Sequence, residues 1–218
     1  MVHSVIGSSS NPPSPALRRE REKQQRREAI LDAAERVFAA QGFHGASIDR
    51  IAQEAAYASG TIYLYFKDKD ALYSALLLRK LAGMVDCVEE AAQAGADPLE
   101  SLRLAIRAQF EFNDRNREFF EVFTRHRVAE QAEHAEEWKR VHETLERHHA
   151  VLARLIERGQ RKKVLRSGDS RTYAAALLGS IIHMSHEMEI SDAPLGREAD
   201  FVFDLFLKGA QRPASPSL

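Results

Sequence analysis

The sequence has little cysteine and no long apolar run. Cys87 is the only cysteine among 218 residues, so no intrachain disulfide can form and nothing indicates an oxidising compartment. No apolar stretch approaches the ~20 residues that a membrane-spanning helix needs. The N-terminus also lacks a basic segment followed by an apolar one, which argues against a signal peptide. We therefore expect a cytoplasmic protein with no membrane partner.

The chain also lacks a strong charge of either sign. Its 31 Lys and Arg side chains nearly balance 32 Asp and Glu, and the formal net charge is -1. Whole-chain charge therefore gives no argument for a nucleic-acid partner. Locally, however, residues 18–28 carry six basic side chains against three acidic ones. Two interpretations stay open for this segment: a solvated helical extension, or an arm that touches DNA phosphate or the minor groove.

Helical periodicity dominates the chain between its two ends, and no strand-like alternation occurs. The first apolar stripe runs from Ile30 to Phe38 and stops at Gly42, a residue suited to a helix C-terminus. Ser47 and Asp97 stand where N-caps are expected, and Asp97 precedes a proline. The pattern predicts an all-α fold of about nine helices. Ends rich in Pro and Ser predict disordered tails at residues 1–20 and 212–218.

Three short helices in a row, the last two separated by a tight turn, are typical of a helix-turn-helix. The third of these segments begins with small residues, Ala58 to Thr61. A helix start without bulk lets the backbone enter the major groove of DNA. Gly60 costs about 1 kcal/mol relative to alanine inside a helix, so close approach to DNA is a physical reason for a glycine there.

Residues 24–80 resemble the DNA-binding domain of the TetR family of transcriptional regulators. The matching positions are Ile51-Ala52, Glu54-Ala55, Gly60-Thr61, Tyr63, Tyr65-Phe66, Lys69 and Leu72. The resemblance implies a helix-turn-helix domain at residues 21–70, with its motif at 47–66. The DNA-contacting residues expected from the resemblance and from their chemistry are Ser47, Ala58, Ser59, Gly60, Thr61, Tyr63, Tyr65 and Lys69. The family usually has glycine where this chain has Ala56. A positive φ would strain an alanine, so the turn is expected to differ slightly from the family's.

The resemblance also implies a ligand-binding and dimerisation domain at residues 71–211. It suggests a regulator, in most cases a repressor, that binds a pseudo-palindromic double-stranded operator as a dimer. Aromatic residues crowd this part of the chain, which favours a largely apolar small-molecule effector. The residues expected to contact the effector are Phe110, Phe120, Phe123, Trp138 and His142.

A homodimer is expected because the segment around residues 173–188 has apolar residues in two rows. A helix that is apolar on two faces needs two partners, one in its own domain and one in another subunit. The expected interface residues are Leu178, Ile181, Ile182, Phe201 and Leu205.

The sequence contains nine histidines, which suggest two alternative functions. One is a metal-responsive regulator that uses the region of His183, His186 and Glu187. The other is a helical metalloenzyme, because Glu146 and His149 match half of a di-iron motif. That motif needs two such elements and two further glutamates, and only one element is present. We therefore expect no enzyme, no cofactor and no assigned metal site.

Overall fold

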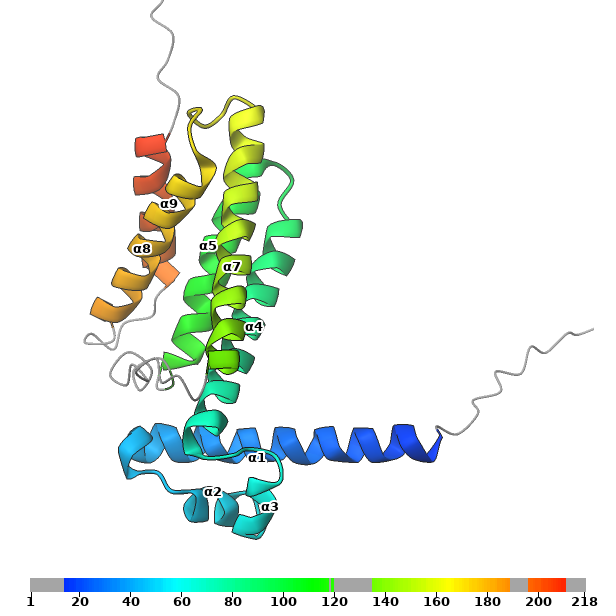
Figure 1. Cartoon of the computed structure of the whole chain (residues 1–218). Helices are drawn as coiled ribbons and strands as arrows, with labels where there is room; N and C mark the ends of the chain where they lie inside the picture. The colour runs from blue at the N-terminus through cyan, green and yellow to red at the C-terminus, as the bar shows by residue number, and fades with distance from the viewer. Residues whose placement is uncertain (1–13, 118, 120–134, 189–195, 211–218) are drawn as a thin grey trace, which may run out of the picture.

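The computed structural model describes residues 14–117, 119, 135–188 and 196–210 of the chain. Within these ranges the fold is all-α, as the periodicity predicts, with eight helices and no strand (Figure 1). The helices are α1 Pro15–Gly45, α2 Ile48–Glu54, α3 Ser59–Tyr63, α4 Lys69–Gln93, α5 Pro98–Arg115, α7 Ala135–Arg161, α8 Ser170–Met188 and α9 Gly196–Ala210.

The first three helices form a small unit at one end of the molecule, and α4 rises from it into an upright bundle (Figure 1). Helix α1 lies across the base of this bundle, with α2 and α3 on its far side. In the bundle α4 packs against α5 and α7, and α8 and α9 cover the side of α5 and α7. No helix of the described residues combines the length and apolar character needed to cross a membrane.

Local sequence signals set the ends of several helices. The Ser47 hydroxyl accepts a hydrogen bond of 3.2 Å from the Arg50 amide, which caps α2. The Asp97 carboxylate accepts bonds from the first free amides of α5, and Pro98 follows it at the first helical position. Both caps are confirmed, because an N-cap depends only on residues within one turn.

The N-terminal boundary is different from the prediction. Helix α1 begins at Pro15, so the disordered tail expected at residues 1–20 is wrong for residues 15–20, which are helical. The remaining residues of both expected tails, 1–13 and 212–218, lie outside the described part of the chain. At the other end of α1, Gly42 adopts φ +67°, and the chain turns there before a last helical turn ends at Gly45.

A network of ion pairs joins α1 to α4. The Arg79 guanidinium on α4 contacts three carboxylates on α1, those of Glu28, Asp32 and Glu35, at 2.7 to 3.1 Å. These carboxylates raise the pKa of Arg79 despite its partial burial. Helix α4 is thus attached to the N-terminal unit by charge as well as by packing.

Candidate DNA-binding face and effector region

Helix α3 presents its polar and aromatic side chains to solvent while one residue anchors it. Ile62 is fully buried, whereas Tyr63 is 55% exposed and the neighbouring Leu64 is more exposed still. The Ser59 hydroxyl donates a 2.6 Å hydrogen bond to the Asp49 carboxylate, which links the starts of α3 and α2. Helix α3 is therefore held from one side and leaves the other side open to a partner.

The start of α3 has no bulk on its open side. Ala58 and Gly60 are exposed, and a Cβ built on Gly60 would meet no atom within 4 Å. Gly60 also has no positive φ, so nothing within the described chain requires a glycine at this position. Thr61 is half-buried beside it. A close external partner remains as a physical reason for the missing side chain.

The turn between α2 and α3 adopts the conformation that the family pattern implies. Ala56 has φ +57°, which confirms the strain expected for an alanine at this position. The Tyr57 amide donates to the Ala52 carbonyl at 2.9 Å and fixes the turn. The left-handed conformation costs a non-glycine residue about 1–2 kcal/mol. The turn is thus kept in spite of the alanine.

Two of the expected phosphate contacts are occupied within the chain. The Lys69 ammonium donates to the carbonyl oxygens of Phe43 and Ala46, at 2.8 and 2.9 Å. It is half-buried and lies 4.4 Å from the centroid of the Phe43 ring. Lys69 is therefore directed at the end of α1, and the expectation that it reaches a phosphate is corrected. The Ser47 hydroxyl is exposed but accepts the α2 cap bond.

Lys67, in the segment between α3 and α4, is an exposed cation that is absent from the residues expected to contact DNA. Tyr65 is half-buried and lines a small cavity of about 160 Å³ together with Arg27, Phe66 and Lys67. The Arg27 guanidinium lies over the Phe66 ring, 5.3 Å from its centroid. The sequence alone does not show which of Lys67 and Lys69 is free to contact DNA, because both closely follow Tyr65 and Phe66. The fold shows that Lys69 is bound to carbonyl groups of the chain and that Lys67 is exposed.

The structure describes three of the five residues assigned to the effector. Phe110 is fully buried in the core formed with α4 and α7, so its described role is packing. The rings of Trp138 and His142 lie 6.5 Å apart on α7, but His142 is exposed and its Nδ1 is 2.9 Å from the Trp138 carbonyl oxygen. His142 therefore does not line the bundle interior, contrary to the prediction. Phe120 and Phe123 lie outside the described residues.

Two polar residues outside the predicted set, Gln109 on α5 and His148 on α7, are almost fully buried. Within the described part of the chain neither Gln109 Oε1 nor His148 Nε2 has a hydrogen-bond partner. Burial, aided by the neighbouring His149, lowers the pKa of His148 to about 4, so its ring is neutral at pH 7. Unsatisfied buried polar atoms cost about 1–3 kcal/mol each, which favours a ligand that supplies the missing bonds.

The geometry places these two groups at one level of the bundle. Pro98 at the start of α5 and Arg158 near the end of α7 line the same groove, so the two helices run antiparallel. Gln109 follows Pro98 by eleven residues and His148 precedes Arg158 by ten. Equal rise along both helices then brings Gln109 and His148 to similar heights. The sequence signal was present, because His148 continues the apolar row of Val141 and Leu152 on α7.

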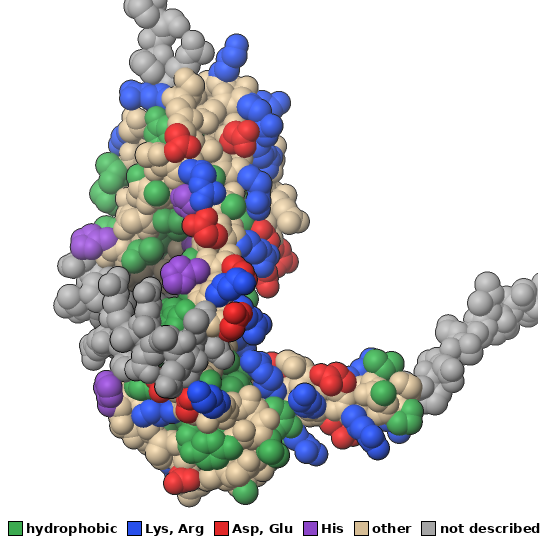
Figure 2. All heavy atoms as spheres, in the orientation of Figure 1, with side chains coloured by type: hydrophobic (Ala, Val, Ile, Leu, Met, Phe, Trp, Pro, Cys, Tyr) green, Lys and Arg blue, Asp and Glu red, His purple; other side chains and the backbone are tan. Residues whose placement is uncertain are grey.

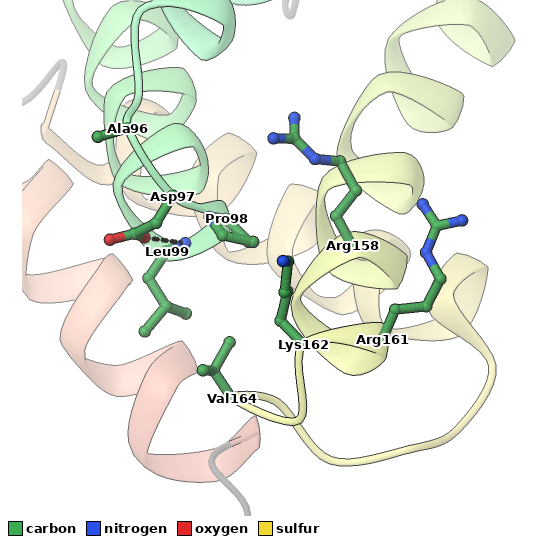
Figure 3. Close-up of a pocket in the computed structure, with 8 residues that line it drawn as sticks. All are labelled: Ala96, Asp97, Pro98, Leu99, Arg158, Arg161, Lys162 and Val164. Carbon is green, nitrogen blue, oxygen red and sulfur yellow. Dashed lines mark hydrogen bonds between the residues drawn. The ribbon is translucent and has the colours of Figure 1, made fainter.

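A larger groove opens at the far end of the bundle, between the start of α5 and the end of α7 (Figure 3). Its volume is about 820 Å³, and Pro98, Leu99 and Val164 give it an apolar side. Arg158 and Lys162 extend toward the space between the helices, and Asp97 turns its carboxylate to the Leu99 amide. Cations suit the C-terminal end of a helix such as α7, which accounts for these side chains without a ligand.

The histidine-rich region gives no support to a metal site within the described residues. No group of three His, Cys, Asp or Glu side chains there could hold a metal ion. His183 is exposed on α8, whereas the side chains of His186 and Glu187 lie outside the description. On α7, Glu146 pairs with Arg171 at 2.6 Å, and His149 Nε2 is 2.9 Å from the Arg171 carbonyl oxygen.

The last two helices leave an apolar face uncovered. Ile182 on α8 is 60% exposed, and Phe201 and Leu205 on α9 are both 56% exposed. Leu178 is half-buried beside them. Ile181 is fully buried within the chain, so its assignment to a dimer interface is wrong. On α8, therefore, Ile181 packs on the chain's own core, whereas Ile182 faces outward.

The short α2–turn–α3 unit with its open α3 face defines a helix-turn-helix protein. A model described as bacterial regulatory proteins of the tetR family matches residues 30–76, and a tetracyclin repressor-like C-terminal domain matches residues 95–186. Together these two models cover more than half of the chain. The chain belongs to the TetR family of regulatory proteins.

Named relatives agree with this assignment. The Fatty acid metabolism regulator protein of Bacillus subtilis is 38% identical over 81 residues, which are 37% of this chain and 42% of that protein. The repressor NicS of Pseudomonas putida is 27% identical over 197 residues, or 85% of this chain and 92% of that one. The matches span only about two fifths of the length of the B. subtilis relative and of the activator FasR of Mycolicibacterium smegmatis.

Solved structures match over most of the fold. The transcriptional regulator FadR from Bacillus subtilis, in complex with stearoyl-CoA, superposes with a TM-score of 0.73 and 25% identity. The match covers 84% of this chain and 99% of FadR. PfmR from Thermus thermophilus, a TetR family transcriptional regulator, matches with a TM-score of 0.70, also at 25% identity and over 84% and 99% of the two chains.

Proposed function

We propose that this protein is a ligand-responsive transcriptional repressor that binds a pseudo-palindromic operator as a homodimer, and that it has no enzymatic activity. The observation that carries the proposal is the open start of α3. Gly60 has free space around it and needs no glycine for the fold, while Tyr63 next to it is exposed. A major-groove partner explains both features, since it requires a thin backbone and polar tips.

The homodimer is supported by the apolar face of α8 and α9. Ile182, Phe201 and Leu205 would each lose water contact against a second copy, and burying the exposed part of such side chains contributes on the order of 1–2 kcal/mol apiece. A two-fold axis at this face makes each patch its own partner. It also presents two copies of α3 to successive turns of the major groove, about 34–36 Å apart.

The proposed effector has a long apolar part and one hydrogen-bonding group. Gln109 and His148 are the residues that would bind the polar group, because their inward atoms lack partners within the described chain. The bundle around them is apolar, with Phe110 and Leu152 among its buried residues. The similarity to FadR solved with stearoyl-CoA makes a long-chain acyl thioester a suitable first probe.

Release from DNA requires that the effector prefer one conformation of the dimer over the other. Helix α4 is suited to transmit this preference. It packs on α5 and α7 in the bundle, and its Arg79 and Lys69 bind groups of α1. A shift of α4 changes the separation of the two α3 helices, and DNA affinity then falls.

The proposal is tested by DNA binding with and without the probe. Purified wild-type protein is titrated into labelled duplexes from the region flanking its own gene, with an unrelated duplex as control. We expect nanomolar binding that Tyr63→Ala weakens at least tenfold with unchanged melting temperature. Stearoyl-CoA is then added, with free CoA as its control. If the protein prefers none of the flanking duplexes over the control, the proposal of a DNA-binding regulator is contradicted. If it binds the operator but no effector releases it, only the proposed ligand response is contradicted.

A further inference from the structure

The first part of α1 extends beyond the domain that it belongs to. Residues 15–27, here termed the α1 arm, project sideways from the helix-turn-helix unit (Figure 1). Residues 14–26 are all exposed. At 1.5 Å per residue the arm is about 20 Å long. Packing of the domain does not account for it, since the buried part of α1 begins only at Ile30.

Basic residues are concentrated on one face of the arm. Arg19, Lys23 and Arg27 are spaced four residues apart and form a row along the helix. Arg26 flanks this row, and two carboxylates stand beside it: Glu20, three residues before Lys23, and Glu22, three residues after Arg19. Arg18 and Arg21 belong to the opposite face, because they are offset from Arg27 by roughly half and a third of a turn.

The basic row ends where α1 meets the segment between α3 and α4. Its last member, Arg27, stacks over Phe66, which follows α3, and shares a small cavity with Tyr65, Lys67 and residues of α4. Continued down α1, the same row leads to Leu31 and the buried core beneath it. The row therefore begins beside the candidate DNA-binding face and runs outward from it for the length of the arm.

The cations of the row are available to an external anion. In the described part of the chain no ion pair involves Arg19, Lys23 or Arg26, and Arg27 pairs only with Glu28, at 3.7 Å. Figure 2 shows basic side chains along the arm with acidic ones among them. Rows of Arg and Lys next to a recognition helix are suited to DNA phosphates, which bind in a sequence-independent way.

We propose that the α1 arm binds backbone phosphates of the DNA beside the operator contact of α3, through Arg19, Lys23, Arg26 and Arg27. This inference rests on the proposed function and extends its DNA site by a second surface. The arm adds affinity and salt dependence and does not read base sequence. It also gives a reason for a helix that is kept solvated over about 20 Å.

The experiment compares two double variants that remove the same charge from the same arm. Arg19→Gln with Lys23→Gln removes two cations from the row, and Arg18→Gln with Arg21→Gln removes two from the opposite face. Glutamine retains helix propensity, so the arm keeps its conformation. Binding to a duplex with the operator and at least one helical turn of flanking DNA on each side is measured from about 50 to 200 mM salt. Thermal melting is recorded for every protein.

The proposal predicts a reduced salt slope for the first variant alone. Each lost phosphate contact lowers the slope of log K against log salt by about 0.9, so the row variant loses about 1.8 per protomer. Its affinity at the lowest salt falls at least tenfold, and the other variant stays near wild type. Equal behaviour of the two variants, whether both are weakened or both are unchanged, overturns the arm proposal. If the wild type still binds the operator in that case, the proposed function as a repressor is not affected. A wild type that binds no operator contradicts the proposed function itself.

Discussion

The Lys69 ammonium donates a hydrogen bond of 2.8 Å to the Phe43 carbonyl oxygen and lies 4.4 Å from the centroid of the same residue's ring. Lys69 is the first residue of α4, and Phe43 follows the turn at Gly42 in α1. A second bond reaches the Ala46 carbonyl. One side chain thus joins α4, which enters the bundle, to the end of the helix that supports α2 and α3.

Replacing Lys69 should lower the stability of the protein and leave its electrostatic contacts with DNA unchanged. Lys69→Met keeps the apolar stem and loses two charge-assisted hydrogen bonds, so we expect a loss of about 1.5–3 kcal/mol in the free energy of unfolding. The salt slope of operator binding should stay at the wild-type value. Lys67→Gln is the control, because Lys67 is exposed and its loss should lower the slope by about 0.9 without destabilising the chain. The reverse pattern would restore Lys69 as a phosphate ligand.

The strained turn offers a stabilising substitution. Ala56→Gly should relieve the positive φ of +57° and raise the free energy of unfolding by about 1 kcal/mol. Ala55→Gly, at φ -79° in the adjacent position, should lower it instead, because glycine gains nothing there and costs backbone entropy. Urea denaturation of the two variants provides the measurement. Equal effects at both positions would show that the turn does not store this strain.

Stability should fall below neutral pH through His148. Burial depresses its pKa to about 4 in the folded protein, against about 6.5 in the unfolded chain. Between these values the unfolded chain binds the extra proton, so stability is complete above pH 6.5 and declines as the pH falls toward 4. The site contributes about 3 kcal/mol to this decline. His148→Leu should flatten the curve over that window, and His142→Gln, at an exposed position on the same helix, should leave the slope unchanged.

The exposed face of α8 and α9 should hold two copies together. Ile182→Glu places a charge in the centre of the proposed interface and should yield a folded monomer in analytical ultracentrifugation, with operator affinity lost. Ile181→Glu should instead unfold the chain, because that side chain is fully buried. Leu145→Glu, exposed on α7, serves as a control that stays dimeric. A wild-type protein that sediments as a monomer at micromolar concentration contradicts the interface.

Sequence predicted what depends on neighbouring residues and missed what depends on distant ones. The caps at Ser47 and Asp97 were predictable, since cap and amide lie within three residues. The target of Lys69 was not, because its acceptor carbonyls lie 26 and 23 residues away.

The choice between adjacent apolar rows was equally out of reach. Ile181 and Ile182 have the same side chain, and periodicity places each in a row of its own. Only the packing of α8 on the bundle decides that Ile181 is covered and Ile182 is not. On α7 the apolar stripe did distinguish the buried histidine from the exposed one. His148 continues the stripe, whereas His142 lies one position after Val141 and is exposed.

The central claim is that DNA approaches the backbone at the start of α3, and Gly60→Ala tests it most directly. A Cβ at Gly60 meets no atom within 4 Å, so the substitution fits the fold, and alanine favours the helix by up to about 1 kcal/mol. Gly83→Ala on α4, where the added carbon would be in ordinary contact with Phe112 at 3.7 Å, is the matched control. We predict that Gly60→Ala melts no lower than wild type yet binds the operator at least tenfold more weakly, while Gly83→Ala binds normally. A Gly60→Ala protein that binds the operator as tightly as wild type would contradict the account.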